Sequence, residues 1–506
     1  MNMKRTAPFF AALFAGSLLA GAAIDNSALM PPYKTDAEVV MEKDAEGGET
    51  PDWIKSLIIV ELRIHSASTD GTVKGLLPAL DHLAEMGVNG VWLTPPINGG
   101  NGYGNFGIHT LSPLLTGEKN PVKQWQVLRN FVDEAHKRNI RVFFDVVNWG
   151  ATKHEGGSRL LKEKPEWFGE YFAPYAGWFF NWENRELNEW FSSRLVEWFL
   201  MTGVDGFRCD CAPNYSGFGP FETAKKRMRS FGRKVVFMAE WTSSGKNVFD
   251  LDQLTFCFTD AKGKRRTHWV GDVYLKKNIV DMVRSGEELR AWDDMEREPG
   301  TKRFYTYMLS CHDSDHYIVK GSPITIGYQA IFAPFIPLWY VGEEWDNAPR
   351  FFVDYFYRRD KHPVPKKWRL YGNVIDWAQK EENRDFFELV KKMIRIRRQH
   401  PEIFEYFPGS HRDSNICKVA TDRPGLLQAY ARFRNGRAVL IVPNNTEKAE
   451  RFRITIPFRE AELAAGKTYR VTDLLEDRTA AEVRNGSFEA EIAAGQLGVF
   501  LVAPAE

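Results

Sequence analysis

The feature that most constrains this chain is a regular alternation of short apolar segments with helix-like segments between residues 53 and 400. The short segments have the length and composition of buried strands, whereas stretches such as residues 125–138 repeat apolar residues at the helical spacing. Candidate strands begin near residues 57, 90, 141, 204, 235, 254, 305 and 335. Eight such units are what a closed (β/α)8 TIM barrel requires, and we predict this α/β fold. An open doubly wound sheet is the alternative, but no Gly-rich phosphate loop follows the first strand to support it.

Both ends of the predicted barrel, which spans residues 53–402, differ from it in pattern. Near the N-terminus, Lys4 and Arg5 precede an apolar run that ends in small residues with the A-x-A arrangement of a signal peptidase site. We expect residues 1–22 to be a signal peptide rather than a membrane anchor, and residues 23–52 to be a flexible leader. Strand-like alternation and an Asn-Gly turn predict an all-β antiparallel sandwich over residues 403–506.

Charge and cysteine content exclude several classes of partner and cofactor. The chain of 506 residues has 67 Lys and Arg against 66 Asp and Glu, a formal net charge of +1. Since no sign of charge is in excess, we expect no nucleic-acid partner. The five cysteines are an odd number and include no C-x-x-C pair, so neither a disulfide framework nor a metal site is expected. We expect an exported protein, periplasmic or extracellular, with no stable membrane association.

Four carboxylates follow four different predicted strands. They are Asp145, Asp210, Glu240 and Asp313. Catalytic groups of a barrel of this type lie at the carboxyl ends of its strands, so these residues should converge. Arg208 lies two positions before Asp210 and should share its face of the strand. One acid alone at a strand end is usually a helix cap or a loop salt bridge, and the Arg208–Asp210 pair is also compatible with a structural ion pair. Close carboxylates separate their pKa values, which allows one to act as an acid and another as a nucleophile.

Four short segments carry a resemblance to a known family. The segments "DVVNWG", "GFRCDCAPN", "MAEW" and "SCHDS" resemble, in order and separation, the four motifs of the α-amylase family of glycoside hydrolases. The resemblance covers roughly residues 55–500. It implies that Asp210 is the nucleophile, Glu240 the general acid/base and Asp313 the acid that stabilises the transition state. For Glu240 we expect a less polar setting that keeps its proton.

The same resemblance implies further contacts to the sugar. Arg208 matches the arginine that keeps the nucleophile ionised, and His312 would hydrogen-bond the hydroxyl groups of the distorted sugar ring. Asp145 resembles the supporting aspartate of the first motif. Tyr103, in "GYGNFG", resembles the tyrosine that stacks under the reacting sugar, and Trp241 closes the "MAEW" segment.

Two departures from the family pattern concern metal binding and the acceptor side of the site. Trp149 and Gly150 stand where the first motif has Asn and His, and Pro213 and Asn214 replace a Lys-His pair of the second motif. Calcium requires six to eight oxygen ligands. We therefore expect no cofactor and no calcium at the usual family position.

An insertion over residues 151–182 corresponds to the B domain of the family, in a short form. Its aromatic residues are suited to stacking on sugar rings, but a segment this short also needs aromatic side chains for its own core. We expect one or two of them to contact sugar. The residues are Trp167, Tyr171, Trp178, Phe179 and Trp182.

The function implied by the resemblance is hydrolysis of α-glucosidic bonds in α-glucans or maltooligosaccharides by a retaining double displacement. A transglycosylase of the same mechanism is one alternative. A barrel that binds glycan without catalysis, or that serves as a partner subunit, is another, since a fold does not establish an activity. Because the polar residues near the reacting sugar are reduced and the B domain is small, we expect short α-glucans to be preferred.

Overall fold

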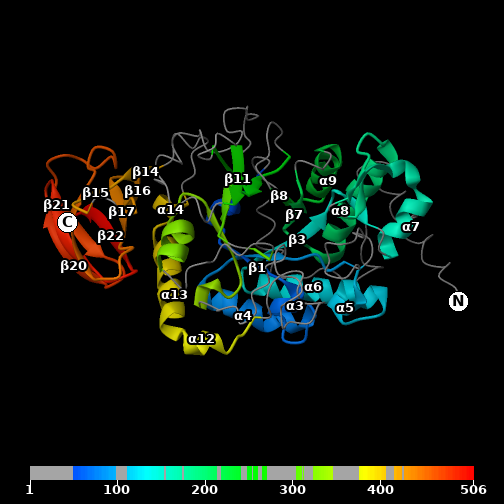
Figure 1. Cartoon of the computed structure of the whole chain (residues 1–506), viewed down its shortest axis with the longest axis horizontal. Helices are drawn as coiled ribbons and strands as arrows, with labels where there is room; N and C mark the ends of the chain where they lie inside the picture. The colour runs from blue at the N-terminus through cyan, green and yellow to red at the C-terminus, as the bar shows by residue number, and fades with distance from the viewer. Residues whose placement is uncertain are drawn as a thin grey trace.

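The computed structural model describes residues 50–97, 111–152, 155–173, 176–212, 218–240, 248–253, 255–259, 265–269, 304–309, 311–312, 323–345, 375–405, 415–423 and 427–505. A barrel forms the centre of the molecule, with a β-sandwich at one end and a small inserted region around α7 at the other (Figure 1). None of the helices in the described ranges is long and apolar enough to cross a membrane.

Eight parallel strands close the barrel and confirm the predicted fold. Their order around it is β1, β2, β3, β7, β8, β9, β12 and β13, and β13 pairs with β1. The strands are β1 (Ile59–Leu62), β2 (Gly90–Leu93), β3 (Arg141–Val147), β7 (Gly206–Asp210), β8 (Val236–Ala239), β9 (Leu251–Gln253), β12 (Phe304–Met308) and β13 (Ile336–Tyr340).

One strand differs from the prediction. The sixth barrel strand is β9, whereas the predicted segment at residues 254–258 falls mainly in β10 (Thr255–Thr259). β10 pairs antiparallel with β11 (Arg265–Trp269) outside the barrel. Thr, Phe and Cys favour any extended pairing, so composition alone does not distinguish a hairpin from a barrel strand.

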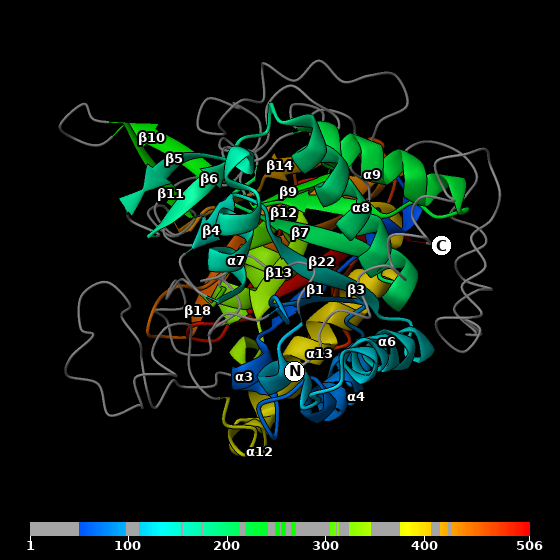
Figure 2. The ribbon, with the colours of Figure 1, turned by 90° about the vertical axis from the view of Figure 1, so that its right-hand side faces the viewer.

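Helices cover the outside of the barrel (Figure 2). Asn120 caps α6 by accepting hydrogen bonds from the backbone N–H groups of Val122 and Lys123, and Pro121 occupies its first turn. Gly203 ends α8 with a φ of +75°, a conformation that glycine adopts without strain. The described α-helices are α3 (Ile64–Ala67), α4 (Leu77–Met86), α5 (Pro113–Thr116), α6 (Pro121–Lys137), α7 (Glu155–Glu163), α8 (Arg185–Thr202), α9 (Phe218–Ser230), α12 (Gln379–Glu382), α13 (Arg384–Gln399) and α14 (Pro401–Phe404).

Five further short helical segments complete the described helices. The π-helix η7 (Ile324–Ile331) is fully buried and lies between β12 and β13. The 3-10 segments are η3 (Asp52–Ser56), η4 (Lys74–Leu76), η5 (Pro165–Trp167) and η8 (Glu343–Trp345).

The inserted region follows β3 directly and therefore begins at the carboxyl end of the barrel. Its three strands are β4 (Gly150–Thr152), β5 (Phe168–Phe172) and β6 (Gly177–Phe180), in the order β4-β6-β5. Phe180 anchors the sheet by packing against Phe191 of α8, with ring centroids 6.3 Å apart. Among the aromatic residues considered for sugar stacking, Trp167 is buried and Tyr171 is exposed.

The C-terminal region is the predicted antiparallel sandwich. The larger sheet has the order β14 (Ile416–Lys418), β16 (Tyr430–Arg434), β17 (Arg437–Pro443), β22 (Leu497–Pro504), β19 (Tyr469–Asp473) and β20 (Arg478–Val483). The smaller sheet has the order β15 (Ala420–Thr421), β18 (Glu450–Thr455) and β21 (Ser487–Ile492). Asn435 and Gly436 join β16 to β17 with φ values of +54° and +70°, as expected for the Asn-Gly turn.

Of two buried arginines in this region, Arg432 joins the sandwich to the barrel, whereas Arg397 ties helix α13 to η7. Arg397 of α13 donates to the carbonyl of Ile331 at 2.6 Å, and Arg432 of β16 donates to the carbonyl of Ala333 at 2.9 Å. Burial lowers the pKa of each guanidinium to about 9. Because Arg432 of the sandwich donates to the carbonyl of Ala333, which follows η7, the position of the sandwich is tied to the outer layer of the barrel.

Candidate active site

The predicted site residues that the structure describes lie at the carboxyl ends of the barrel strands. Asp145 lies two residues before the end of β3, Arg208 and Asp210 end β7, Glu240 follows β8, and His312 follows β12. Asp313, Tyr103 and Trp241 lie outside the described residues, so their roles stay predictions.

Strand alternation explains why these side chains point into the barrel. Phe143 and Met238 belong to the apolar cluster in the barrel interior. Asp145 and Glu240 follow them by two positions and therefore face the same side. The interior thus has an apolar layer below and a charged layer at the rim.

Arg208 is the centre of the charged layer. Its Nη1 atom donates to Asp145 Oδ2 at 3.1 Å and to Asp210 Oδ1 at 2.7 Å. Its Nη2 atom lies 2.8 Å from Glu240 Oε1. A planar guanidinium suits several carboxylates at once, and these contacts favour their ionised forms. The Arg208–Asp210 pair is therefore part of a network that joins three strands.

Trp92 supports this network, and its place near a strand end was its only signal in the sequence. The Arg208 guanidinium lies 4.7 Å from the centroid of the Trp92 ring. The indole Nε1 donates to Asp145 Oδ2 at 3.0 Å. Trp92 therefore fixes Asp145 and stacks against Arg208 at the same time.

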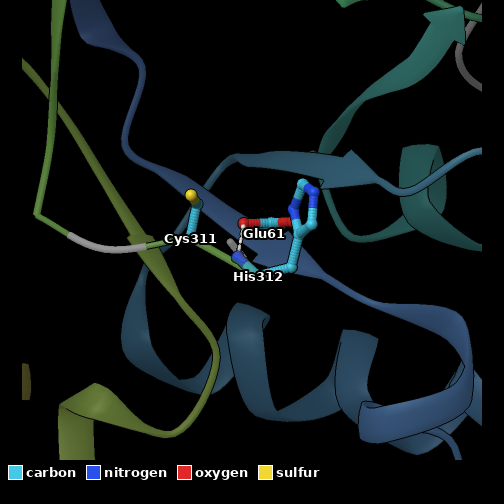
Figure 3. A group of neighbouring side chains, drawn as sticks. All are labelled: Glu61, Cys311 and His312. Atoms are coloured by element: carbon cyan, nitrogen blue, oxygen red, sulfur yellow. Dashed lines mark hydrogen bonds and ion pairs between the residues drawn. The ribbon is translucent and has the colours of Figure 1, made fainter. Parts of the chain in front are cut away.

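Glu61 is a second residue that the sequence reasoning missed. It lies on β1, is fully buried, and accepts hydrogen bonds from the backbone N–H of His312 at 3.2 Å and from His312 Nδ1 at 2.5 Å. Figure 3 shows its carboxylate between Cys311 and His312. A glutamate in the apolar segment "LIIVELR" was the available signal, since buried charges need a partner.

Asp210 and Glu240 approach each other closely. An oxygen of each carboxylate and the Cys211 sulfur all lie within 4.8 Å of one another. Glu240 also accepts the backbone N–H of Cys211 at 2.5 Å. The expectation of a less polar setting for Glu240 was therefore wrong, because Arg208 reaches across from the neighbouring strand and a main-chain donor faces the other oxygen.

The two cysteines beside Asp210, Cys209 and Cys211, point their side chains in different directions. Cys209 lies in the apolar layer between sheet and helices, as the strand alternation predicts, and burial raises the pKa of its thiol. Cys211 instead turns back towards the site, and its sulfur lies 3.7 Å from Asp210 Oδ2. Cys209, Cys211, Cys311 and Cys417 are not in disulfide bonds.

The packing of Trp149 and Gly150 explains why these two residues replace the Asn and His of the family's first motif. Trp149 is buried and packs edge-on against Phe179, with ring centroids 6.1 Å apart. Gly150 starts β4 so close to β6 that a side chain there would overlap the Trp178 carbonyl oxygen. Asn148 is fully buried, and its amide has no hydrogen-bond partner within the part of the chain that the structure describes.

The absence of calcium at the usual family position stays a prediction, because Pro213 and Asn214 lie outside the described residues. Among the described residues, two groups place three potential ligand atoms within 4.8 Å of one another: Glu61, Cys311 and His312, and Asp210, Cys211 and Glu240. Calcium takes six to eight oxygen ligands, whereas both groups include a thiol. The donors that follow Asp145 in the family pattern are replaced by Trp149 and Gly150.

Comparisons with known proteins agree with this geometry. A sequence model described as "Alpha amylase, catalytic domain" matches residues 43–178. Alpha-amylase 2 of Dictyoglomus thermophilum is 22% identical over 465 residues, which cover 83% of this chain and 74% of that protein. Neopullulanase 2 of Thermoactinomyces vulgaris is 20% identical over 429 residues, 78% of this chain and 66% of that protein. Taken together, these similarities support the alpha-amylase family for this chain.

Solved structures of other proteins share the fold of this chain. A noncanonic maltogenic alpha-amylase from Thermotoga neapolitana superposes with a TM-score of 0.65 at 18% identity, over 89% of this chain and 99% of that one. An alpha-amylase from Geobacillus thermoleovorans gives a TM-score of 0.63 at 17% identity, with the same shares of 89% and 99%. The chain is accordingly a glycoside hydrolase of the alpha-amylase type.

Proposed function

We propose that this protein hydrolyses α-glucosidic bonds in short α-glucans by a retaining double displacement. The observation that carries the proposal is the close approach of Asp210 and Glu240, whose carboxylate oxygens lie within 4.8 Å of each other at the rim of the barrel. Retaining glycosidases place their two carboxyl groups roughly 5–5.5 Å apart, whereas inverting enzymes leave roughly 6.5–9.5 Å for a water molecule. The short spacing supports retention.

In the first step, Asp210 attacks the anomeric carbon and the bond to the leaving sugar breaks. Arg208 keeps the attacking carboxylate ionised through a contact of 2.7 Å. Glu240 donates a proton to the departing glycosidic oxygen, which leaves a glycosyl ester on Asp210. Asp313 is the proposed stabiliser of positive charge on the sugar, and His312, Tyr103 and Trp241 are the proposed sugar contacts.

In the second step, Glu240 takes a proton from water, and the resulting hydroxide displaces Asp210 from the anomeric carbon. The contacts from Arg208 Nη2 and the Cys211 N–H favour the carboxylate form of Glu240, which is the form that this step needs. The first step needs the protonated form. We infer that substrate binding loosens the Arg208 contact and allows Glu240 to take up its proton.

Short chains are the proposed substrates because Trp149 and Gly150 replace two polar residues of the family's first motif. Trp149 is turned into the core of the insertion, and Gly150 has no side chain. The insertion presents instead an aromatic pair, Tyr171 and Trp178, whose ring centroids are 4.9 Å apart. Tyr171 is 46% exposed, and its flat face suits the apolar face of a sugar ring.

Rates on maltotriose to maltoheptaose, compared with soluble starch, test this function. We expect higher kcat/KM on the oligosaccharides and shorter sugars as products, resolved by chromatography. A clear preference for starch would contradict the chain-length proposal. Products longer than the substrate would favour the transglycosylase, and no turnover on any α-glucan would favour a barrel that only binds.

We also propose that the protein is exported, because its first 22 residues have the pattern of a signal peptide. Intact mass of the mature protein from its native host should begin after Ala22. Retention of Met1 to Ala22 in that protein would contradict this.

A further inference from the structure

Cys211 has a backbone conformation that is unusual for its residue type. It directly follows Asp210 at the end of β7 and has a φ of +57°. The left-handed region costs a residue with a side chain roughly 1–2 kcal/mol, and such strain persists where the surrounding structure requires it. The location of this strain, one residue after the proposed nucleophile, points to a role in the site.

The conformation allows Cys211 to contact both reacting carboxyl groups. In an extended strand its side chain would face away from that of Asp210. With the positive φ, the thiol instead donates to Asp210 Oδ2 at 3.7 Å. Its backbone N–H donates to Glu240 Oε2 at 2.5 Å. Arg208 holds the other oxygen of each carboxylate, so the two carboxyl groups are fixed from two sides.

We propose that Cys211 is a positioning residue that fixes Asp210 and Glu240 at their mutual distance and stabilises the ionised nucleophile. The inference rests on the proposed function, since it concerns the reacting pair of that reaction. Cys211 is 4% exposed, so water does not compete for its thiol. The chain contains its own control, because Cys209 is equally buried and two residues away but faces the opposite layer.

Substitutions separate the thiol contact from packing and from backbone strain. The variants are Cys211→Ser, Cys211→Ala and Cys211→Gly, with Cys209→Ala as the matched control. Serine keeps a donor at nearly the same position, and glycine keeps the backbone N–H while adopting a positive φ without strain. Cys211→Gly therefore tests the thiol even if Cys211→Ala folds poorly.

We expect C211A and C211G to lower kcat about tenfold with little change in KM, since a hydrogen bond to a charged group is lost in both. The kcat of C211S should stay within about threefold of wild type, because the serine hydroxyl replaces the thiol as donor. The kcat of C209A should stay within about twofold, because Cys209 donates no hydrogen bond to the site. The acidic limb of kcat/KM against pH should move to higher pH in C211A and C211G only. Among the described residues, the charged groups around Asp210 are Arg208 on its own strand, Glu240 after β8, and Asp145 of β3, which shares the Arg208 guanidinium with it.

Two results overturn the inference. In an active wild type, unchanged kcat and pH profile in C211A and C211G would show that the thiol has no such role. A loss in C211S as large as that in C211A would show that the side chain acts by volume alone. A wild type that hydrolyses no α-glucan contradicts the proposed function itself, and the inference with it.

Discussion

Replacing Glu61 with Gln should reduce catalysis although Glu61 is not expected to touch the substrate. Glu61 holds His312 by two hydrogen bonds, one to the backbone N–H and one to Nδ1. Residue 312 immediately precedes Asp313, the proposed third carboxylate of the site. Glu61 therefore fixes both the imidazole ring and the start of the segment that carries Asp313. A glutamine of nearly the same volume keeps one acceptor oxygen and presents an amide donor in place of the other.

The size of the effect follows from the bond that is lost. A hydrogen bond that involves a charged group contributes about 1.5–3 kcal/mol. At about 1.4 kcal/mol for each tenfold change in rate, kcat/KM of E61Q should fall by roughly 10- to 150-fold. The double variant E61Q/H312A should be no more than about threefold slower than H312A, because Glu61 acts through His312.

A second buried pair supplies the control. Glu344 accepts from His82 Nε2 at 2.7 Å and is as fully buried as Glu61, but His82 lies on helix α4 outside the barrel. E344Q and E61Q should both lower the free energy of unfolding, by about 3–5 kcal/mol in urea titrations, since each breaks a buried pair. Only E61Q should lower kcat/KM on maltooligosaccharides at a temperature where both variants are folded. Equal kinetic losses in the two variants, or additive losses in E61Q/H312A, would refute the positioning role.

Three further predictions concern stability and metal. Burial raises the pKa of Asp205, but the positive charges of His136, Arg141 and Arg233 outweigh burial and leave this pKa below its ordinary value. Asp205 therefore stabilises the fold above about pH 4, and this contribution is lost as the pH falls. D205N should therefore cost about 3–5 kcal/mol at pH 7 and less at pH 3, and equal losses in urea titrations at both pH values would contradict this. R432M should separate the unfolding of the sandwich from that of the barrel, and calorimetry of this variant should then show two transitions. A single transition, unchanged from wild type, would contradict this prediction. Protein purified without chelator should contain no stoichiometric calcium, and one tightly bound ion per chain, required for activity, would be the contrary result.

Seven of the eight barrel strands were predictable because apolar runs and helical periodicity alternate clearly along the chain. The sixth was not, because β9 has only the three residues Leu251–Gln253, whereas the apolar segment that follows it pairs with β11. A strand of that length carries too little pattern to outweigh a longer neighbour.

The site residues divide along similar lines. Asp145, Arg208, Asp210 and Glu240 were predictable, since charges at the ends of apolar strands require an explanation. Glu61 carried the same signal, but its partner His312 lies 251 residues away and no local pattern connects them. The position of Cys211 was not predictable, because strand alternation would turn its side chain away from Asp210 and takes no account of a residue that leaves the strand with a positive φ.

Covalent trapping of the glycosyl-enzyme tests the central claim most directly. A 5-fluoro-α-glucosyl fluoride reacts through the first step of a retaining enzyme but slows the second, so the sugar remains attached to the nucleophile. We predict that peptide mass spectrometry will find the sugar on Asp210, and that the D210N variant will carry none. An active enzyme that is labelled on a different carboxylate, or that turns over the reagent with no covalent adduct and releases product of inverted configuration, would contradict the account.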